Sequence, residues 1–211
     1  MRIIAGKARG TTLETLDGED TRPTLERVKE NFFNAINFDV ADSKVLDLFA
    51  GSGQLGLEAL SRGAKEAVFV DANPECIGII TRNAQKAKLY DRCNIYKYEY
   101  SEYLSVLKKR RDFNKFDIIF LDPPYKSGVK AINDCIKRII KNNIIADNGL
   151  IICETGNGEQ LSLELNEELL KSIKSSRIYK YGKVYITILT ITIFTTEIMQ
   201  DENGEDQNYG E

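Results

Sequence analysis

The chain has 211 residues, of which 42% are hydrophobic and 29% are charged, and these values are ordinary for a globular protein with one α/β domain. It contains no histidine, which excludes an imidazole base, a serine–histidine pair and a histidine-ligated metal. No run approaches eighteen apolar residues, and the N-terminus lacks the apolar segment of a signal peptide. We therefore expect a cytoplasmic protein with no membrane partner.

The charge is unevenly distributed along the chain. The net charge is −3, but residues 197–211 hold six acids and no base, which leaves residues 1–196 at +3. This composition predicts a disordered acidic tail, and the mildly basic remainder permits a nucleic-acid partner without requiring one. The four cysteines include no C-x-x-C pair, so we expect reduced, packed thiols and no metal site.

The first forty residues have a pattern different from the rest. Glycines interrupt residues 1 to about 20, which predicts a small hairpin. A helix is predicted over residues 24–36, where Leu25, Val28, Phe32 and Ile36 recur at helical spacing.

From Lys44 onward, β-rich runs alternate with amphipathic segments. The predicted strands are residues 44–50, 67–71, 94–98, 116–122 and 149–154, and the segments between them have helical spacing. This alternation predicts a mostly parallel sheet with right-handed crossovers. The final runs of residues 176–194, joined at Gly182, predict an antiparallel hairpin at the sheet edge.

The loop after the first strand has the sequence FAGSGQLG, residues 49–56. Gly51 and Gly53 allow a tight turn and close approach of a ligand, and the following helix presents free N–H groups. Asp71 ends the second strand, where its carboxylate can accept from ribose hydroxyls. These features suit either a dinucleotide or S-adenosylmethionine, and Asp47 on the first strand favours the second. We expect Gly56 to serve helix packing.

The sequence LDPPY, residues 121–125, follows the fourth strand. The strand delivers Asp122 to the sheet edge where ligands bind, and the two prolines stiffen the loop. Asp122 and the Pro123 carbonyl are acceptors that can orient an exocyclic amine toward a sulfonium methyl group, while Tyr125 can stack on an extruded base. This chemistry needs no histidine.

The motif DPPY at this position is typical of class I amino-methyltransferases. The segments RIIAGKARG, residues 2–10, and RPTLERVKENFFNAI, residues 22–36, resemble the RsmD family of 16S ribosomal RNA guanine-N2 methyltransferases. The resemblance covers roughly residues 1–185. It implies a class I Rossmann-like fold with a mostly parallel seven-stranded sheet, an antiparallel C-terminal hairpin and a small N-terminal extension. The implied units are an RNA-facing segment 1–40, a methyltransferase domain 41–196 and the tail 197–211.

The resemblance also implies the site residues and the partners. S-adenosylmethionine is the implied cofactor, and the implied substrate is 16S RNA in the small subunit or its assembly intermediate. We expect a monomer, because no long apolar surface segment stands out in the sequence. The implied catalytic residues are Asp122, Pro123 and Tyr125. The implied cofactor-binding residues are Asp47, Phe49, Gly51, Gly53, Asp71, Ala72, Ser101 and Asp122. Phosphate contacts are implied for Arg9, Arg22, Arg27 and Lys29, with solvated surface charge as the alternative interpretation.

Two features depart from the family pattern, and other functions stay open. The C-terminal run ITIFTTEIMQ and the acidic tail extend past the usual end of the family, and the second departure is at residue 100. Tyr100 stands where such enzymes commonly place an acid or amide near the adenine, and Glu99 or the Ser101 backbone could replace it. The alternative acceptors are adenine N6, cytosine N4 or a protein glutamine. An NAD-dependent oxidoreductase would lack an evident hydride-transfer partner, and a silent RNA-binding assembly factor would not need DPPY.

Overall fold

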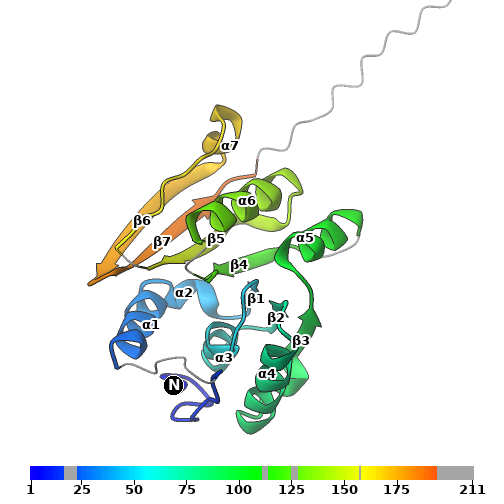
Figure 1. Cartoon of the computed structure of the whole chain (residues 1–211), viewed down its shortest axis with the longest axis vertical. Coiled ribbons are helices and arrows are strands. Elements are labelled where there is room, and N and C mark those ends of the chain that lie inside the picture. Colours follow the sequence, from blue (N-terminus) through cyan, green and yellow to red (C-terminus); the bar gives the residue numbers. More distant parts are fainter. Residues whose placement is uncertain (17–22, 111–113, 125–127, 157, 194–211) are drawn as a thin grey trace, which may run out of the picture.

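One mixed sheet organises the chain in the computed structural model, which describes residues 1–16, 23–110, 114–124, 128–156 and 158–193. The strand order is β3-β2-β1-β4-β5-β7-β6 (Figure 1). The strands are β1 (Lys44–Asp47), β2 (Glu66–Asp71), β3 (Cys93–Lys97), β4 (Phe116–Leu121), β5 (Ile145–Thr155), β6 (Ile173–Tyr181) and β7 (Val184–Ile191). The first five are parallel, whereas β7 is antiparallel to β5 and β6. The predicted seven-stranded sheet with an antiparallel C-terminal hairpin is confirmed.

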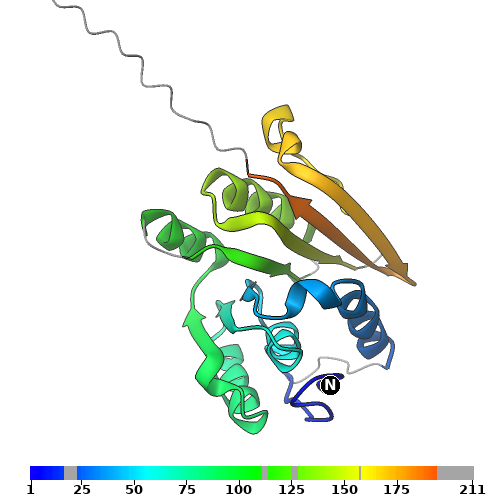
Figure 2. The ribbon, with the colours of Figure 1, turned by 180° about the vertical axis from the view of Figure 1, so that it is seen from behind.

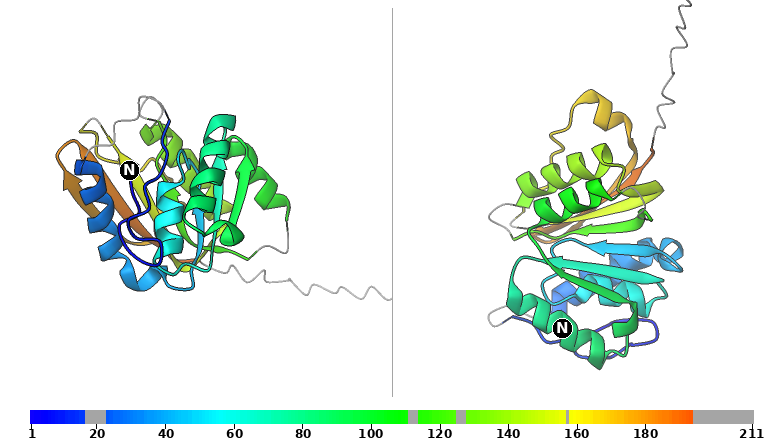
Figure 3. Two further views of the ribbon diagram at one scale, coloured as in Figure 1. Left: turned by 90° about the horizontal axis from the view of Figure 1, so that it is seen from below. Right: turned by 90° about the vertical axis from the view of Figure 1, so that its right-hand side faces the viewer.

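Helices cover both faces of the sheet (Figure 1 and Figure 3). They are α1 (Pro23–Ala35), α2 (Asn37–Val40), α3 (Gln54–Ser61), α4 (Pro74–Lys86), α5 (Tyr100–Lys109), α6 (Gly128–Lys141) and α7 (Glu167–Lys171), with a 3-10 turn at Tyr90–Arg92. One buried cluster joins α1, α3 and α4 to one sheet face, and a second joins α5 and α6 to the other. In the described part of the chain, no helix is long and apolar enough to span a membrane.

The N-terminal residues belong to the same core as the sheet. Ile3, Ala8 and Leu13 lie in one cluster with α1 and with β-strand residues such as Phe120. The rings of Phe32 and Phe33 lie 4.8 Å apart, and Phe33 lies 5.6 Å from Phe120. The boundary expected near residue 40 therefore does not separate two cores.

The predicted N-terminal hairpin is reduced to one antiparallel bridge, between Arg2 and Thr12. Residues 1–14 run beside α3 (Figure 2). Lys7 N–H donates to the carbonyl of Ser61, the last residue of α3, at 2.8 Å. Gly6 makes this approach possible, because a Cβ on it would lie 1.9 Å from the Ser61 carbonyl oxygen. The close contact shows why a glycine stands at this position.

Candidate active site

The glycine loop connects the end of β1 to the start of α3. Gly51 and Gly53 have φ values of +52° and +79°, which favour glycine, and Gly53 is the N-cap of α3. A Cβ on Gly51 would meet no atom within 4 Å, so the space above this backbone is open. A ligand can therefore approach the loop closely next to the N-terminus of a helix.

Asp71 fixes this loop to the end of β2. Its two carboxylate oxygens accept from the backbone N–H groups of Gly51 and Asn73, each at 2.8 Å. Asn73 in turn caps α4 by accepting from Glu75 N–H at 2.9 Å. Ala72 lies exposed between them. The predicted ribose acceptor is thus held against the predicted cofactor loop.

Gly56 has a packing role, as the sequence predicted. A Cβ at this position would lie 2.3 Å from Cε1 of Phe69 on β2, so only glycine lets α3 pack this closely. Its N–H donates to Asp47 at 3.0 Å, which ties the first turn of α3 to the end of β1.

Asp47 is an acid in an unfavourable environment. Its side chain is buried, and the residue is 2% exposed. Burial raises the pKa of Asp47 to about 7, the Gly56 N–H opposes the shift, and the charges of Asp122 and Asp71 add to it. The charged groups that perturb this carboxyl are both carboxylates, so this edge of the sheet favours a positively charged ligand.

The proline motif lies on the strand next to β1. Asp47 pairs in register with Phe120 of β4, and β4 ends at Leu121. Asp122 is therefore placed at the same edge as the glycine loop; it is half-buried, and Pro123 after it is buried. Tyr125 lies outside the described residues.

The sequence reasoning missed one acid at this edge, Glu154. It stands near the end of β5, one position after Cys153, which pairs with Leu121. Burial raises the pKa of Glu154 well above its ordinary value, and the charge of Asp122 adds to the shift. Its position at the end of a parallel strand was the signal that could have identified it.

The segment after β3 shows what Tyr100 does. Its ring lies 5.2 Å from that of Phe49, and its hydroxyl faces Asp134 of α6. Tyr100 therefore packs toward α6. Ser101 lies in the first turn of α5, where backbone N–H groups have no partner within the helix, and the Glu99 side chain is exposed. Glu99 and the Ser101 backbone both stay predicted replacements for the family's acid.

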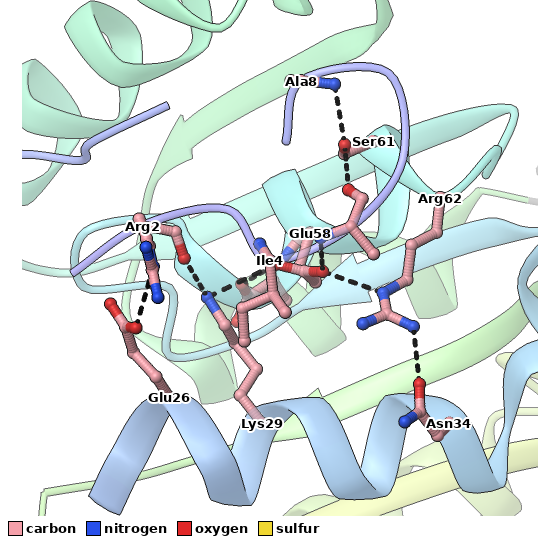
Figure 4. A network of polar contacts seen from close by, with 12 residues as sticks. Arg2, Ile4, Ala8, Glu26, Lys29, Asn34, Glu58, Ser61 and Arg62 are labelled. Carbon is pink, nitrogen blue, oxygen red and sulfur yellow. Dashed lines mark hydrogen bonds and ion pairs between the residues drawn. The ribbon is translucent and has the colours of Figure 1, made fainter. Parts of the chain in front are cut away.

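The structure corrects the assignment of Lys29 to RNA contact. Lys29 is 2% exposed, and its ammonium donates to the Arg2 carbonyl at 2.9 Å and lies 3.5 Å from Glu58 (Figure 4). Burial lowers the pKa of Lys29, and Glu58 opposes that shift. The other candidates differ: Arg9 and Arg27 are exposed, while Arg22 lies outside the described residues.

Glu58 holds the N-terminal segment in place. Its fully buried carboxylate accepts from Ile4 N–H at 2.8 Å, from Ala5 N–H at 3.1 Å and from Arg62 Nε at 2.8 Å (Figure 4). A second buried residue, Asn83 of α4, pairs with both backbone groups of Glu14 and donates to the Ser52 carbonyl of the glycine loop at 2.9 Å. The segment is thus bonded to the helix and the loop that form the site.

Known proteins resemble this chain over most of its length. The family described as Conserved hypothetical protein 95 matches residues 1–190. "Ribosomal RNA small subunit methyltransferase D" of Haemophilus influenzae is 37% identical over 186 residues, covering 85% of this chain and 93% of that protein. The protein of the same name from Escherichia coli is 34% identical over 155 residues, covering 74% of each.

A solved structure shares the architecture. The "putative methyltransferase yhhF" from Escherichia coli superposes with a TM-score of 0.74 and 27% sequence identity, covering 92% of this chain and 99% of that one. The likeness therefore extends over most of both chains.

Proposed function

The chain belongs to the RsmD family, the one described as Conserved hypothetical protein 95, and on that premise we propose that it methylates the N2 amine of a guanine in 16S ribosomal RNA. We propose S-adenosylmethionine as the methyl donor and the small subunit, or its assembly intermediate, as the substrate. The observation that carries the proposal is that the glycine loop and the Asp122-Pro123 motif lie at the same edge of the sheet. The glycine loop follows β1, and Asp122-Pro123 follows the neighbouring β4.

The residues at this edge fit the proposed cofactor. Asp71 offers carboxylate oxygens to ribose hydroxyls, and the open backbone at Gly51 adjoins the N-terminus of α3, which suits a carboxylate. The acids Asp47 and Asp122 suit a ligand with positive charges and disfavour a pyrophosphate. When bound, S-adenosylmethionine supplies an electrophilic methyl group on a positively charged sulfur.

The chain's own residues then orient and stabilise the acceptor amine. The Asp122 carboxylate and the Pro123 carbonyl accept hydrogen bonds from the two N–H groups of the amine, which turns its lone pair toward the methyl group. As the nitrogen gains positive charge, the Asp122 carboxylate stabilises it and can take up the proton that the methylated amine loses. The buried Pro123 keeps this loop rigid, so little reorganisation accompanies the reaction.

We assign RNA contact to exposed cations of the N-terminal part. Arg9 and Arg27 have exposed side chains that can bind phosphates, and Arg22 stays a prediction. We further propose that the protein works as a monomer in the cytoplasm, where its substrate is assembled.

Methyl transfer to purified subunits tests this function. Small subunits from cells that lack the endogenous enzyme are incubated with labelled S-adenosylmethionine, the methylated nucleotide is mapped by primer extension, and the modified nucleoside is identified. We expect N2-methylguanosine at one nucleotide. Methylation of adenine N6 or cytosine N4 instead would refute the proposed acceptor, and no transfer by folded protein would refute the activity.

Asp122→Ala separates catalysis from cofactor binding. We expect it to abolish transfer while calorimetry shows a much smaller loss of S-adenosylmethionine affinity, because Asp122 holds the amine and contributes only its charge to cofactor binding. Asp39→Ala is the matched control, since Asp39 is exposed on α2, which precedes β1. Loss of cofactor binding in Asp122→Ala would contradict the assigned role.

A further inference from the structure

Glu154 lies beside Asp122 on the adjacent strand. Leu121 of β4 pairs in register with Cys153 of β5, so the next residues on the two parallel strands are Asp122 and Glu154. Side chains alternate along a strand, and Phe120 and Ile152 belong to one buried cluster whereas Leu121 and Cys153 belong to the other. Asp122 and Glu154 are therefore directed to the same side of the sheet.

A small cavity of about 10 Å³ adjoins Pro123, and Glu154 is part of its wall. Its other lining residues include Pro123, Gly128, Val129, Thr155 and Gly156. The wall behind it is braced, because Thr155 Oγ1 donates to the Glu159 carbonyl and Glu159 N–H donates to the Gly156 carbonyl at 3.0 Å. Pro123 has no N–H to offer, whereas the Glu154 carboxyl stands on the neighbouring strand, next to Asp122 in register.

Guanine has a feature that a carboxyl group in this position can read. Its N2 amine is flanked by the ring N1–H, which is a donor. The amines of adenine and cytosine are flanked by ring nitrogens that are acceptors. If Asp122 and Pro123 hold the amine, the Glu154 carboxyl on β5 can accept a hydrogen bond from the ring nitrogen next to that amine. Among the amine-bearing bases, only guanine has a hydrogen on that nitrogen.

We propose that Glu154 selects guanine by accepting the N1–H of the base whose N2 amine is held by Asp122 and Pro123. This inference rests on the proposed function and adds to it the residue that distinguishes guanine from other amine-bearing bases. A flipped base is commonly read in this way, through hydrogen bonds to its Watson–Crick edge.

The electrostatics of the pocket support this role. Burial and the neighbouring Asp122 charge raise the pKa of Glu154, so the ionised carboxylate is costly until a donor reaches it. Two further titratable groups are near: Glu159 lines the same pocket, and Tyr185 of β7 pairs in register with Thr155. Guanine N1–H offsets the cost of the charge and so stabilises the ionised form. An acceptor nitrogen at the same place would be repelled by that form and bound only by the protonated acid, so the preference for guanine should grow as pH rises.

Base substitution at the target nucleotide tests the proposal. Small subunits are rebuilt from ligated 16S RNA that carries either guanine or 2,6-diaminopurine at the mapped nucleotide. The analogue keeps the N2 amine but has an acceptor at N1. We expect the protein to prefer guanine by about tenfold to a hundredfold in kcat/KM, the worth of a hydrogen bond to a charged group.

Glu154→Gln should remove most of this preference. An amide can present either its oxygen or its N–H group to the ring nitrogen, so guanine and the analogue become nearly equal substrates. Glu168→Gln is the matched control, because Glu168 is exposed on α7. Calorimetry with S-adenosylmethionine verifies that each variant is folded and binds cofactor.

The outcomes separate the two claims. If the unmodified protein methylates guanine but Glu154→Gln keeps its full preference over the analogue, the inference is wrong and the proposed function stands. If the unmodified protein shows no preference, the inference is equally wrong. If no guanine N2 is methylated in any rebuilt subunit that the endogenous enzyme can modify, the proposed function itself fails.

Discussion

Asp47→Asn tests the cost of the buried acid at the end of β1. The pKa of Asp47 is raised from 3.8 to about 7 in the folded protein. The folded state therefore keeps its proton over a pH range in which the unfolded chain has released it, and the free energy of unfolding falls as pH rises from about 4 to 7. Linkage gives a loss of about 2–3 kcal/mol between roughly pH 5 and pH 8. Asparagine does not titrate, and its oxygen can still accept from Gly56 N–H.

Urea unfolding across this pH range measures the effect. We expect the free energy of unfolding of Asp47→Asn, relative to that of the unmodified protein, to rise by about 2–3 kcal/mol between roughly pH 5 and pH 8. The reason is that only the aspartate becomes charged over this range. Asp39→Asn is the control, since that side chain is exposed, and its difference from the unmodified protein should stay constant. A constant difference for Asp47→Asn as well would refute the reasoning that burial and neighbouring carboxylates raise this pKa.

Two further substitutions probe packing and the buried ion cluster. Gly56→Ala should lower the free energy of unfolding by about 1–3 kcal/mol, because its Cβ would lie 2.3 Å from the Phe69 ring. Glu58→Gln should lower it by about 3–5 kcal/mol, because Lys29 and Arg62 would stay buried without their counter-charge. Urea unfolding at neutral pH measures both.

Matched substitutions show whether these losses are specific. Gly78→Ala also changes a helical glycine, but its Cβ would meet the flexible end of Arg82, so little loss is expected. Glu66→Gln removes a carboxylate from a half-buried pair with Lys44, which should matter far less than the fully buried one. Unchanged urea midpoints in Gly56→Ala or Glu58→Gln would contradict the packing and charge arguments respectively.

The sequence was sufficient for the parts of the fold that follow local patterns. Alternation of β-rich and amphipathic runs predicted the sheet, and Gly182 predicted the C-terminal turn, where φ is +63°. Gly51 and Asp71 were predicted to lie together, because a strand–loop–helix unit brings the ends of adjacent parallel strands to one edge. The short helices α2 and α7 were not predicted, since segments this short carry too little periodicity.

Burial of charged residues could not be predicted from local sequence. Lys29 lies in a segment rich in cations, yet its partner Glu58 is in another helix. The sequence shows Glu154 as an acid near the end of a parallel strand, but its burial beside Asp122 depends on the register of β4 and β5. Both cases depend on contacts between distant segments, which neither composition nor spacing reports.

The attachment of residues 1–14 has a consequence for how a ligand would meet them. Glu58 and Asn83 hold this segment from two helices, so its backbone is already ordered in the free protein. A segment that folds only on contact gives up conformational entropy and loses affinity. Lys7 and Arg9 stand on a prearranged backbone, and the speed of encounter with a polyanion should depend on ionic strength rather than on a slow folding step.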